Sequence, residues 1–473
     1  MKKLGKIHFT GVKGVGMAPL AIIAKEAGFQ VTGSDLKEEF ITDQSLRRAG
    51  VIIFEGFSSE NIKDSDLIIT TGAHGGFDNP EVLAAKLLNI PIWTQGEAAG
   101  RFMSGEIFSK KWTGISVAGS HGKTTTAAMI ATILKEAKQD PSFLIGTGNI
   151  SSLGGPGHFG KGNYFIAESD EYATEPKYDK TPKLLWQKPK IAVITNIEFD
   201  HPDMYSSEEE IEKAFLSFVN NLSSDGVVVA CGDDSQVKIL LSEYKGRFIK
   251  YGLSPTNDFY IERYSISGDR MFFWVKSKDT LIGEFSVGVV GEHNAINALG
   301  AIVVAQEAGL QLEQIKKGLS AYLGSKRRFE YIGQLASGAL LYDDYAHHPT
   351  EIKQTLSAFR KTFPKHKIIC IFQPHTYSRT KSLFEQFSNS FGSSDTAVLT
   401  NIYPSLREDK DDTISSELLA QNVAKFHRNV LYLPELSDVV EYIDENSFGK
   451  DTIIISMGAG DVYKIGERLE LKK

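Results

Sequence analysis

Short apolar runs alternate with amphipathic, helix-length segments over most of this chain, and this alternation restricts the possible folds more than any other feature. Residues 7–10 predict a strand, residues 19–27 a helix and residues 29–32 a second strand. Such a strand–helix–strand unit is typical of a parallel sheet, so the sequence predicts an α/β protein. Further strands are expected at residues 67–70, 90–93, 114–118, 164–167, 191–195, 339–342, 368–372, 396–400 and 452–456, and further helices at residues 124–137, 208–222 and 294–307.

Two interruptions of this pattern divide the 473 residues into three consecutive α/β units. A polar stretch at residues 104–111 ends the first unit, and a segment near residues 323–325 ends the second. Three domains also fit the length, at about 150 residues each. We expect a Rossmann-like domain over residues 1–108, a central P-loop ATPase-like domain over residues 109–323 and a C-terminal Rossmann-like domain over residues 324–473.

The composition excludes several classes of protein. A net charge of -7 gives no overall attraction for nucleic acid, so no nucleic-acid partner is expected. The cysteines Cys231 and Cys370 fit a reducing compartment better than a disulfide scaffold. No stretch reaches the ~18 apolar residues of a membrane span, and the N-terminal apolar run is too short for a signal peptide. We expect a cytoplasmic protein without membrane insertion, as a monomer or a weak homodimer.

A glycine-rich turn follows the first predicted strand, with Gly11, Gly14 and Gly16 before Met17. Glycine lets the backbone approach a phosphate, and the next helix offers free N–H groups there. Asp35 ends the second strand, where it could accept from a ribose or a base. The spacing G-x-x-G-x-G differs from the usual dinucleotide fingerprint, so the turn indicates either nucleotide binding or tight packing alone.

A second turn, Gly119-Ser-His-Gly-Lys-Thr-Thr-Thr, lies between a strand and a long helix. A glycine loop in this place cradles phosphates, Lys123 would reach the β and γ oxygens, and a hydroxyl would bind Mg²⁺. Two residues separate these glycines, where the usual P-loop has four. The strand–turn–helix context favours ATP binding over a simple helix start.

Polar residues follow the next two predicted strands of the central unit. Glu168, Asp170 and Glu171 come after one strand, and Asn196, Asp200 and His201 after the other. Ligands of open α/β sheets bind at such strand ends, and carboxylate oxygens suit Mg²⁺. We expect one of the three acids to hold the metal, and a catalytic or metal role for His201. A solvated acidic loop is the alternative for the acids.

Four further polar clusters follow later in the chain. His293 and Asn297 share one helix face beside Asn294, where an ordinary polar cap is equally possible. Arginines at 327 and 328 could be a solvated surface or reach across a cleft to a γ-phosphate. The runs 343–349 and 372–380 carry histidines after strands, but no third ligand at helical spacing accompanies them, which does not favour zinc.

Taken in order, these motifs resemble those of the Mur ligase family, from Gly11 to about Gly460. The motifs that carry the resemblance are Gly119-Ser-His-Gly-Lys-Thr-Thr-Thr, Glu168-Ser-Asp-Glu, Thr195-Asn-Ile-Glu-Phe-Asp-His, His293-Asn-Ala-Ile-Asn, Lys326-Arg-Arg-Phe, Asp343-Asp-Tyr-Ala-His-His-Pro and Phe372-Gln-Pro-His. Seven ordered motifs are far more specific than any one of them.

The resemblance implies a role for each matching residue. The first domain would bind the UDP part of UDP-N-acetylmuramate, through Gly11, Gly14, Gly16 and Met17, with Asp35 nearby. The central domain would bind Mg-ATP, through Gly119, Ser120, His121, Gly122, Lys123, Thr124 and Thr125, with Asn196, His293, Asn294 and Asn297 on the nucleotide. Thr124 and Glu168 would hold one Mg²⁺, and His201 a second. From the third domain, Arg327 or Arg328 would reach the γ-phosphate and Asp344 the ribose, while Tyr345, His347, His348, His375 and Arg379 would frame an amino-acid site.

The resemblance also implies a reaction. The lactyl carboxylate of UDP-N-acetylmuramate would attack the γ-phosphorus of ATP, and the amine of L-alanine would then attack the acyl phosphate to form an amide. Lys123, the arginine and Mg²⁺ would offset the negative charge. His201 or His348 is expected as base or orienter, with the choice left open. Family members often have arginine after the histidine of Phe372-Gln-Pro-His, whereas this chain has Thr376, so recognition of the alanine carboxylate would rest on Arg379.

Three alternatives remain at this point. A related ligase adds murein tripeptide to the same sugar nucleotide, but the run Gln373-Pro-His-Thr-Tyr-Ser-Arg favours alanine as the acceptor. A nicotinamide dehydrogenase would explain the first glycine turn, yet the Lys123 loop and the acids at 168–171 have no place in that chemistry. A non-catalytic UDP-sugar sensor needs neither Glu168 nor His201.

Overall fold

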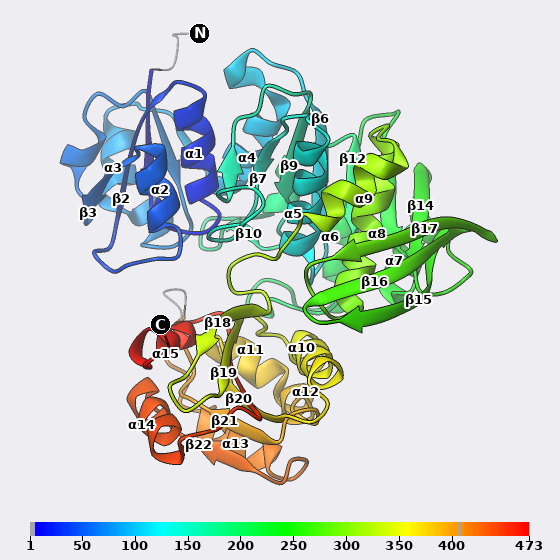
Figure 1. The fold of residues 1–473 in the computed structure, drawn as a ribbon. Helices are drawn as coiled ribbons and strands as arrows, with labels where there is room; N and C mark the ends of the chain where they lie inside the picture. Colours follow the sequence, from blue (N-terminus) through cyan, green and yellow to red (C-terminus); the bar gives the residue numbers. More distant parts are fainter. Residues whose placement is uncertain (1–4, 405–407, 473) are drawn as a thin grey trace.

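The computed structural model describes residues 5–404 and 408–472 and has the predicted three-part α/β architecture (Figure 1). Residues 1–4 and 473, which the predicted domain ranges include, lie outside the described residues, as does the start of the N-terminal run. Each predicted strand and helix is present, with ends that differ by a few residues. The boundaries at residues 108 and 323 remain predictions.

The first unit is a parallel sheet in the order β3-β2-β1-β4-β5 with helices on both faces. The order turns back between β1 and β4, so the glycine turn after β1 lies at a switch point, where such sheets bind ligands. The strands are β1 (Lys6–Thr10), β2 (Gln30–Asp35), β3 (Ile52–Glu55), β4 (Leu67–Thr70) and β5 (Ile92–Thr94). The helices are α1 (Ala18–Glu26), α2 (Asp43–Ala49), η1 (Ser59–Ile62), η2 (Gly76–Asp78), α3 (Pro80–Leu87), α4 (Gln95–Ser104) and η3 (Glu106–Phe108).

The central unit has a large mixed sheet in the order β17-β16-β15-β14-β13-β12-β6-β9-β7-β8. Strand β6 lies between β12 and β9, so the loops after these three strands meet at one edge. The strands are β6 (Thr113–Ala118), β7 (Ser142–Leu144), β8 (Gly157–His158), β9 (Tyr164–Glu168), β12 (Ile191–Ile194), β13 (Val227–Cys231), β14 (Arg247–Gly252), β15 (Phe259–Ser267), β16 (Arg270–Ser277) and β17 (Thr280–Val287), beside a ribbon of β10 (Ala173–Glu175) and β11 (Asp179–Pro182). The helices are α5 (Lys123–Glu136), η4 (Lys183–Trp186), α6 (Glu208–Asn220), α7 (Ser235–Glu243), α8 (Glu292–Glu307) and α9 (Leu312–Ser320).

The third unit is a sheet in the order β18-β19-β23-β20-β21-β22, in which only β18 runs antiparallel to its neighbour among the described strands. The strands are β18 (Glu330–Gln334), β19 (Leu340–Asp344), β20 (Lys367–Phe372), β21 (Thr396–Leu399), β22 (Val430–Tyr432) and β23 (Thr452–Met457). The helices are α10 (Pro349–Thr362), α11 (Tyr377–Ser382), α12 (Phe384–Ser388), α13 (Ser416–Val423), α14 (Leu436–Asn446), η5 (Val462–Lys464) and α15 (Ile465–Arg468).

The first two units are packed side by side, and the third lies across from both (Figure 1). Buried Leu144, Phe165 and Ala167 of the central unit belong to the same apolar cluster as the core of the first unit. Helix α1 packs on β7 and β8, and α4 packs on η4. The site residues described below lie where the third unit faces the other two units, which are packed together. In the described part of the chain, no helix is long and apolar enough to cross a membrane.

Candidate active site

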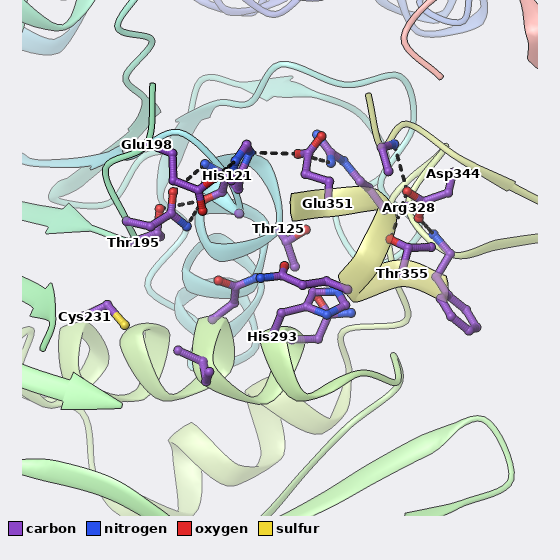
Figure 2. A pocket seen from close by; sticks show the side chains of 18 of the residues that line it. His121, Thr125, Thr195, Glu198, Cys231, His293, Arg328, Asp344, Glu351 and Thr355 are labelled. Carbon is purple, nitrogen blue, oxygen red and sulfur yellow. Dashed lines mark hydrogen bonds and ion pairs between the residues drawn. The ribbon is translucent and has the colours of Figure 1, made fainter. Parts of the chain in front are cut away.

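Two neighbouring cavities lie around the loop that joins β6 to α5. The smaller one, of about 230 Å³, lies between the central and third units and is shown in Figure 2. The larger one, of about 600 Å³, is lined by residues of all three units. His121, Gly122, Arg328 and Glu351 line both cavities, so the two are separated only by a few side chains.

The loop after β6 has the conformation that its glycines predict. Gly122 has φ +79° at the start of α5, and a Cβ there would lie 2.6 Å from Oδ1 of Asn297. Gly119 lines neither cavity, and a Cβ on it would lie 2.0 Å from Oγ1 of Thr195, so this glycine serves close packing. Ser120, Lys123 and Thr124 line the larger cavity, and Thr125 the smaller one.

The Lys123 ammonium donates to Oε2 of Glu171 at 2.8 Å and to the Gly119 carbonyl at 2.6 Å. Burial alone would lower the pKa of Lys123, but Glu171 and Asp170 outweigh it and raise this pKa. Lys123 is therefore fully charged, as a phosphate ligand must be. A phosphate in the cavity would compete with Glu171 for it.

The acids after β9 meet His201 at the edge of the larger cavity. Glu168 accepts a hydrogen bond from Oγ1 of Thr124 at 3.0 Å, and burial raises its pKa. Ligand atoms of Asp170, Glu171 and His201 lie within 4.8 Å of one another. Oε1 of Glu171 is buried and accepts no hydrogen bond within the described residues. An orphaned buried oxygen beside other hard ligands fits a divalent cation such as Mg²⁺.

His201 itself has φ +58°, a backbone conformation that is uncommon for a residue with a side chain and often occurs at functional sites. Its Nε2 lies 3.7 Å from Oε1 of Glu171. The predicted metal residues therefore come together in two adjacent groups, Thr124 with Glu168 and His201 with Glu171.

The smaller cavity contains the polar residues that were predicted for the nucleotide. His293, Asn294 and Asn297 line it from the first turns of α8, and Asn196 and Asp344 line it from the loop after β12 and the end of β19 (Figure 2). Burial raises the pKa of Asp344 to about 6 and lowers that of His293 to about 4. Cys231 also lines this cavity, and no motif in the sequence predicts it there.

The structure separates the two predicted arginines. Arg327 is buried and donates to Oδ2 of Asp343 at 3.0 Å and to the carbonyls of Gly460 and Gly458 at 3.1 and 2.5 Å. It lines neither cavity. Arg328 lines both cavities and lies 3.8 Å from Glu351. Because Arg327 has φ +60°, the chain turns sharply between the two, which favours Arg328 as the phosphate ligand.

A group of charged residues joins the central and third units. His121 lies between two carboxylates, with Nε2 3.4 Å from Glu198 and Nδ1 3.3 Å from Glu351 (Figure 2). Burial would lower the pKa of His121, but the two carboxylates raise it to about 10. Glu351 was missed by the sequence analysis, since an acid in the first turn of a helix is an ordinary capping residue.

His348 lies beside His121, with ring centroids 4.6 Å apart, and its side chain caps α10. Burial and the charge on His121 lower the pKa of His348 to about 4, so this imidazole is neutral. Like Gly119 and Arg327, it lines neither cavity.

Residues predicted for the other substrates lie on the larger cavity. Gly14, Gly16 and Met17 line it from the first unit. Gly11 and Asp35 do not, and Asp35 instead accepts from the backbone N–H groups of Lys13 and Leu36 and so holds the turn.

Four residues of the third unit that were predicted for the amino-acid site also line this cavity: Tyr345, His347, His375 and Arg379. The Arg379 guanidinium donates to Oδ1 of Asp200 in the central unit at 2.8 Å. Lys183 also lines the cavity, 2.8 Å from Asp170, and was not predicted.

Fold and site together define a multidomain nucleotide-binding α/β enzyme. Three family models match the chain, the Mur ligase family catalytic domain at residues 6–106, the Mur ligase middle domain at residues 117–305 and the Mur ligase glutamate ligase domain at residues 327–460. The chain belongs to the Mur ligase family, whose members are ATP-dependent ligases that form amide bonds.

Similar proteins of known name extend over the whole chain. A UDP-N-acetylmuramate–L-alanine ligase of Desulfitobacterium hafniense is 38% identical over 98% of this chain and 99% of its own length. One of Geobacter sp. (strain M21) is 39% identical over 99% and 98%. The crystal structure of UDP-N-acetylmuramate-alanine ligase from Thermotoga maritima has a TM-score of 0.80 and 27% identity over 98% of this chain and 97% of that one. A murein peptide ligase from Psychrobacter arcticus follows with a TM-score of 0.71 and 25% identity, covering 98% of each chain.

Proposed function

We propose that this protein joins L-alanine to the lactyl carboxylate of UDP-N-acetylmuramate, with ATP converted to ADP and phosphate, in the synthesis of peptidoglycan precursors. The observation that carries the proposal is the pair of adjoining cavities, one lined by the predicted nucleotide residues and one by all three units. Relatives at 38–39% identity over nearly full length bear the name of this activity, which supports the alanine reading over the murein tripeptide alternative.

The charged residues around the β6 loop would offset the negative charge of the reacting phosphate. Lys123 is held at the floor of the larger cavity and Arg328 enters from the third unit. Electrostatic stabilisation by preplaced charges is the main way in which proteins assist phosphoryl transfer. Arg327 would act only through the backbone that it fixes at Gly458 and Gly460.

Mg²⁺ would be held by Thr124 and Glu168 at one position and by His201, next to Glu171, at another. Bound there, it would supply Lewis-acid stabilisation of phosphate oxygens. Thr124 and Glu171 are buried and Glu168 is half-buried, and this chain's role is to hold their oxygens at fixed positions.

The amino-acid site is proposed where Tyr345, His347, His375 and Arg379 line the larger cavity. The Arg379 guanidinium would bind the carboxylate of alanine, since arginine forks suit that geometry. Of the two predicted bases, His201 lies on this cavity and His348 does not. Because an imidazole that holds Mg²⁺ has no free lone pair, we propose that His201 orients the amine and does not take its proton. His348 would act as a positioning residue at the start of α10.

The position of the larger cavity between the three units would also help to exclude water from the reaction. An acyl phosphate hydrolyses readily, so water must be kept out once it forms. Residues from all three units enclose the larger cavity, which fits closure of the third unit over the substrates. Cytoplasmic location and a monomeric or weakly dimeric state remain predictions.

The test is phosphate release from Mg-ATP with UDP-N-acetylmuramate and one acceptor at a time: L-alanine, glycine, L-serine or murein tripeptide. We expect release only when the sugar nucleotide and L-alanine are both present, together with one equivalent of the amide product. Release with the tripeptide alone would assign the recycling reaction instead. Nucleotide binding without amide formation would indicate the non-catalytic sensor.

A further inference from the structure

Two histidines and a glutamate meet at the boundary of the central and third units, apart from the acids that suit Mg²⁺. Ligand atoms of His121, Glu198 and His348 lie within 4.8 Å of one another. Nε2 of His121 and Nδ1 of His348 lie 3.4 and 3.5 Å from the same oxygen, Oε2 of Glu198. The edges of a tetrahedron around zinc are about 3.3 Å, given bonds of about 2.0–2.1 Å.

The imidazole nitrogens here are poorly satisfied by hydrogen bonds. Nε2 of His121 and Nε2 of His348 are buried without a hydrogen-bond partner within the described residues. The two side chains are each 6% exposed. Buried polar nitrogens in native proteins are normally paired, so the orphaned Nε2 of His121, which faces Glu198 at 3.4 Å, points to a missing ligand. Nδ1 of His348 accepts from the N–H of Thr350 at 3.3 Å, and a bound metal would replace that hydrogen bond.

We propose that His121, Glu198 and His348 form a transition-metal site, of the Zn²⁺ class, that bridges the central and third units. Two imidazoles and one carboxylate are a donor set that zinc prefers and magnesium does not. Since His121 and Glu198 border the smaller cavity, a water or a phosphate oxygen can complete the coordination from that side.

The surroundings have the supporting contacts of a metal centre. Glu351 lies 3.3 Å from Nδ1 of His121, on the side of the ring away from Glu198, as carboxylates behind ligating histidines do. The Thr350 hydroxyl donates to Oε2 of Glu198 at 2.6 Å and orients it. The two acids, Glu351 behind the site and Glu198 within it, make positive charge favourable there.

The consequence is a link between two units that otherwise meet through polar contacts. His121 and Glu198 come from the loops after β6 and β12, while His348 is the first residue before α10. A bound metal would hold α10 against the β6 loop. No third metal ligand lies near the histidine run at 343–349 in the sequence. The fold brings Glu198 to it from more than 140 residues away.

The test is a titration of the chelator-treated full-length protein with Co²⁺, in excess Mg²⁺ and without nucleotide. We expect one equivalent of Co²⁺ with visible bands of tetrahedral intensity, displaced by Zn²⁺ and not by Mg²⁺. His348→Asn keeps a side chain that caps a helix well and removes the imidazole. It and His121→Asn should each weaken Co²⁺ binding at least tenfold, and Glu198→Gln, which keeps the shape, should do the same.

His347→Asn is the matched control, because His347 is the neighbouring histidine and lines the other cavity. It should bind Co²⁺ as the parent does. His201→Asn tests whether Co²⁺ binds instead at the group formed by Asp170, Glu171 and His201. Loss of Co²⁺ binding in His201→Asn with full binding in His348→Asn would overturn the proposal, as would the absence of tetrahedral bands in the parent protein.

Discussion

The two interfaces of the central unit are built from different chemistry. Against the first unit it contributes buried Leu144 and Phe165 to a shared apolar core. Against the third unit it presents charged and polar side chains, with His121 facing Glu351, Glu198 accepting from Thr350 and Asp200 accepting from Arg379. One interface resembles the inside of a domain, and the other resembles a transient contact.

This difference predicts which unit moves. Separating an apolar core of this kind costs many kilocalories per mole, because exposing apolar surface to water costs about 25 cal/mol for each Å². When ion pairs separate, water and counterions solvate the freed charges, so these pairs contribute little net free energy to the interface. We therefore expect the first two units to act as one body and the third to open and close over the substrates.

The largest effect is expected at the residue that lies between the two interfaces. Lys123→Ala removes the charge that the phosphates need and should lower kcat by about 10³-fold or more. Both interfaces should stay intact, but buried Glu171 loses its partner, so the unfolding temperature should fall and activity is compared where both proteins are folded. Lys135→Ala, at the exposed far end of the same helix, is the control and should turn over normally. Normal phosphate release by Lys123→Ala would refute the site assignment.

The apolar interface can be broken by one methyl group. A Cβ on Gly100 of α4 would lie 2.1 Å from the carbonyl oxygen of Trp186 in η4, and backbone cannot move aside cheaply. Gly100→Ala should lose about 2–3 kcal/mol of stability by overpacking, seen as a lower midpoint in urea. Gly155→Ala, whose Cβ would meet nothing closer than 4.0 Å, should unfold like the parent. Equal midpoints for both variants would show that α4 and η4 are not pressed together.

The polar interface is tested at Arg379. Arg379→Ala should raise the KM for L-alanine about 10- to 100-fold with a smaller change in kcat, which corresponds to about 1.4–2.8 kcal/mol. Arg379→Lys keeps the charge opposite Asp200 but not the fork, so it should retain the docking of the third unit and still bind alanine weakly. The control is Arg360→Ala, in the same unit, which pairs with Asp395 near the surface. An unchanged KM would move the carboxylate site elsewhere.

The sequence predicted most of this arrangement because local patterns determine it. Strand ends that face one edge of a sheet bring Lys123, Glu168 and Asn196 together, and the alternation of elements reveals those ends. Long-range pairing has no such local signature. Glu351 reaches His121 only through the docking of the third unit. Arg327 and Arg328 point to different places because Arg327 has a positive φ. Such a φ is uncommon for a non-glycine residue, so the sequence does not predict it.

The smallest effect concerns three ionisable side chains on the rim of the apolar interface. His158 of the central unit lies 2.8 Å from Glu26 of α1 and 3.1 Å from Asp140, and these carboxylates raise its pKa while their own are lowered. The histidine contributes stability that is complete below its unfolded pKa of 6.5 and is lost as the pH rises through its higher folded pKa. The carboxylates contribute stability that is lost as the pH falls below about 4.

These three side chains therefore stabilise the interface most between about pH 4.5 and 6.5. All three side chains are more than a third exposed, so the contribution stays well under 1 kcal/mol. His158→Ala should flatten this shallow optimum in the unfolding temperature, and salt should flatten it in the parent. A loss of several kilocalories per mole in His158→Ala, independent of pH, would mean that the rim, and not the apolar core, holds the first two units together.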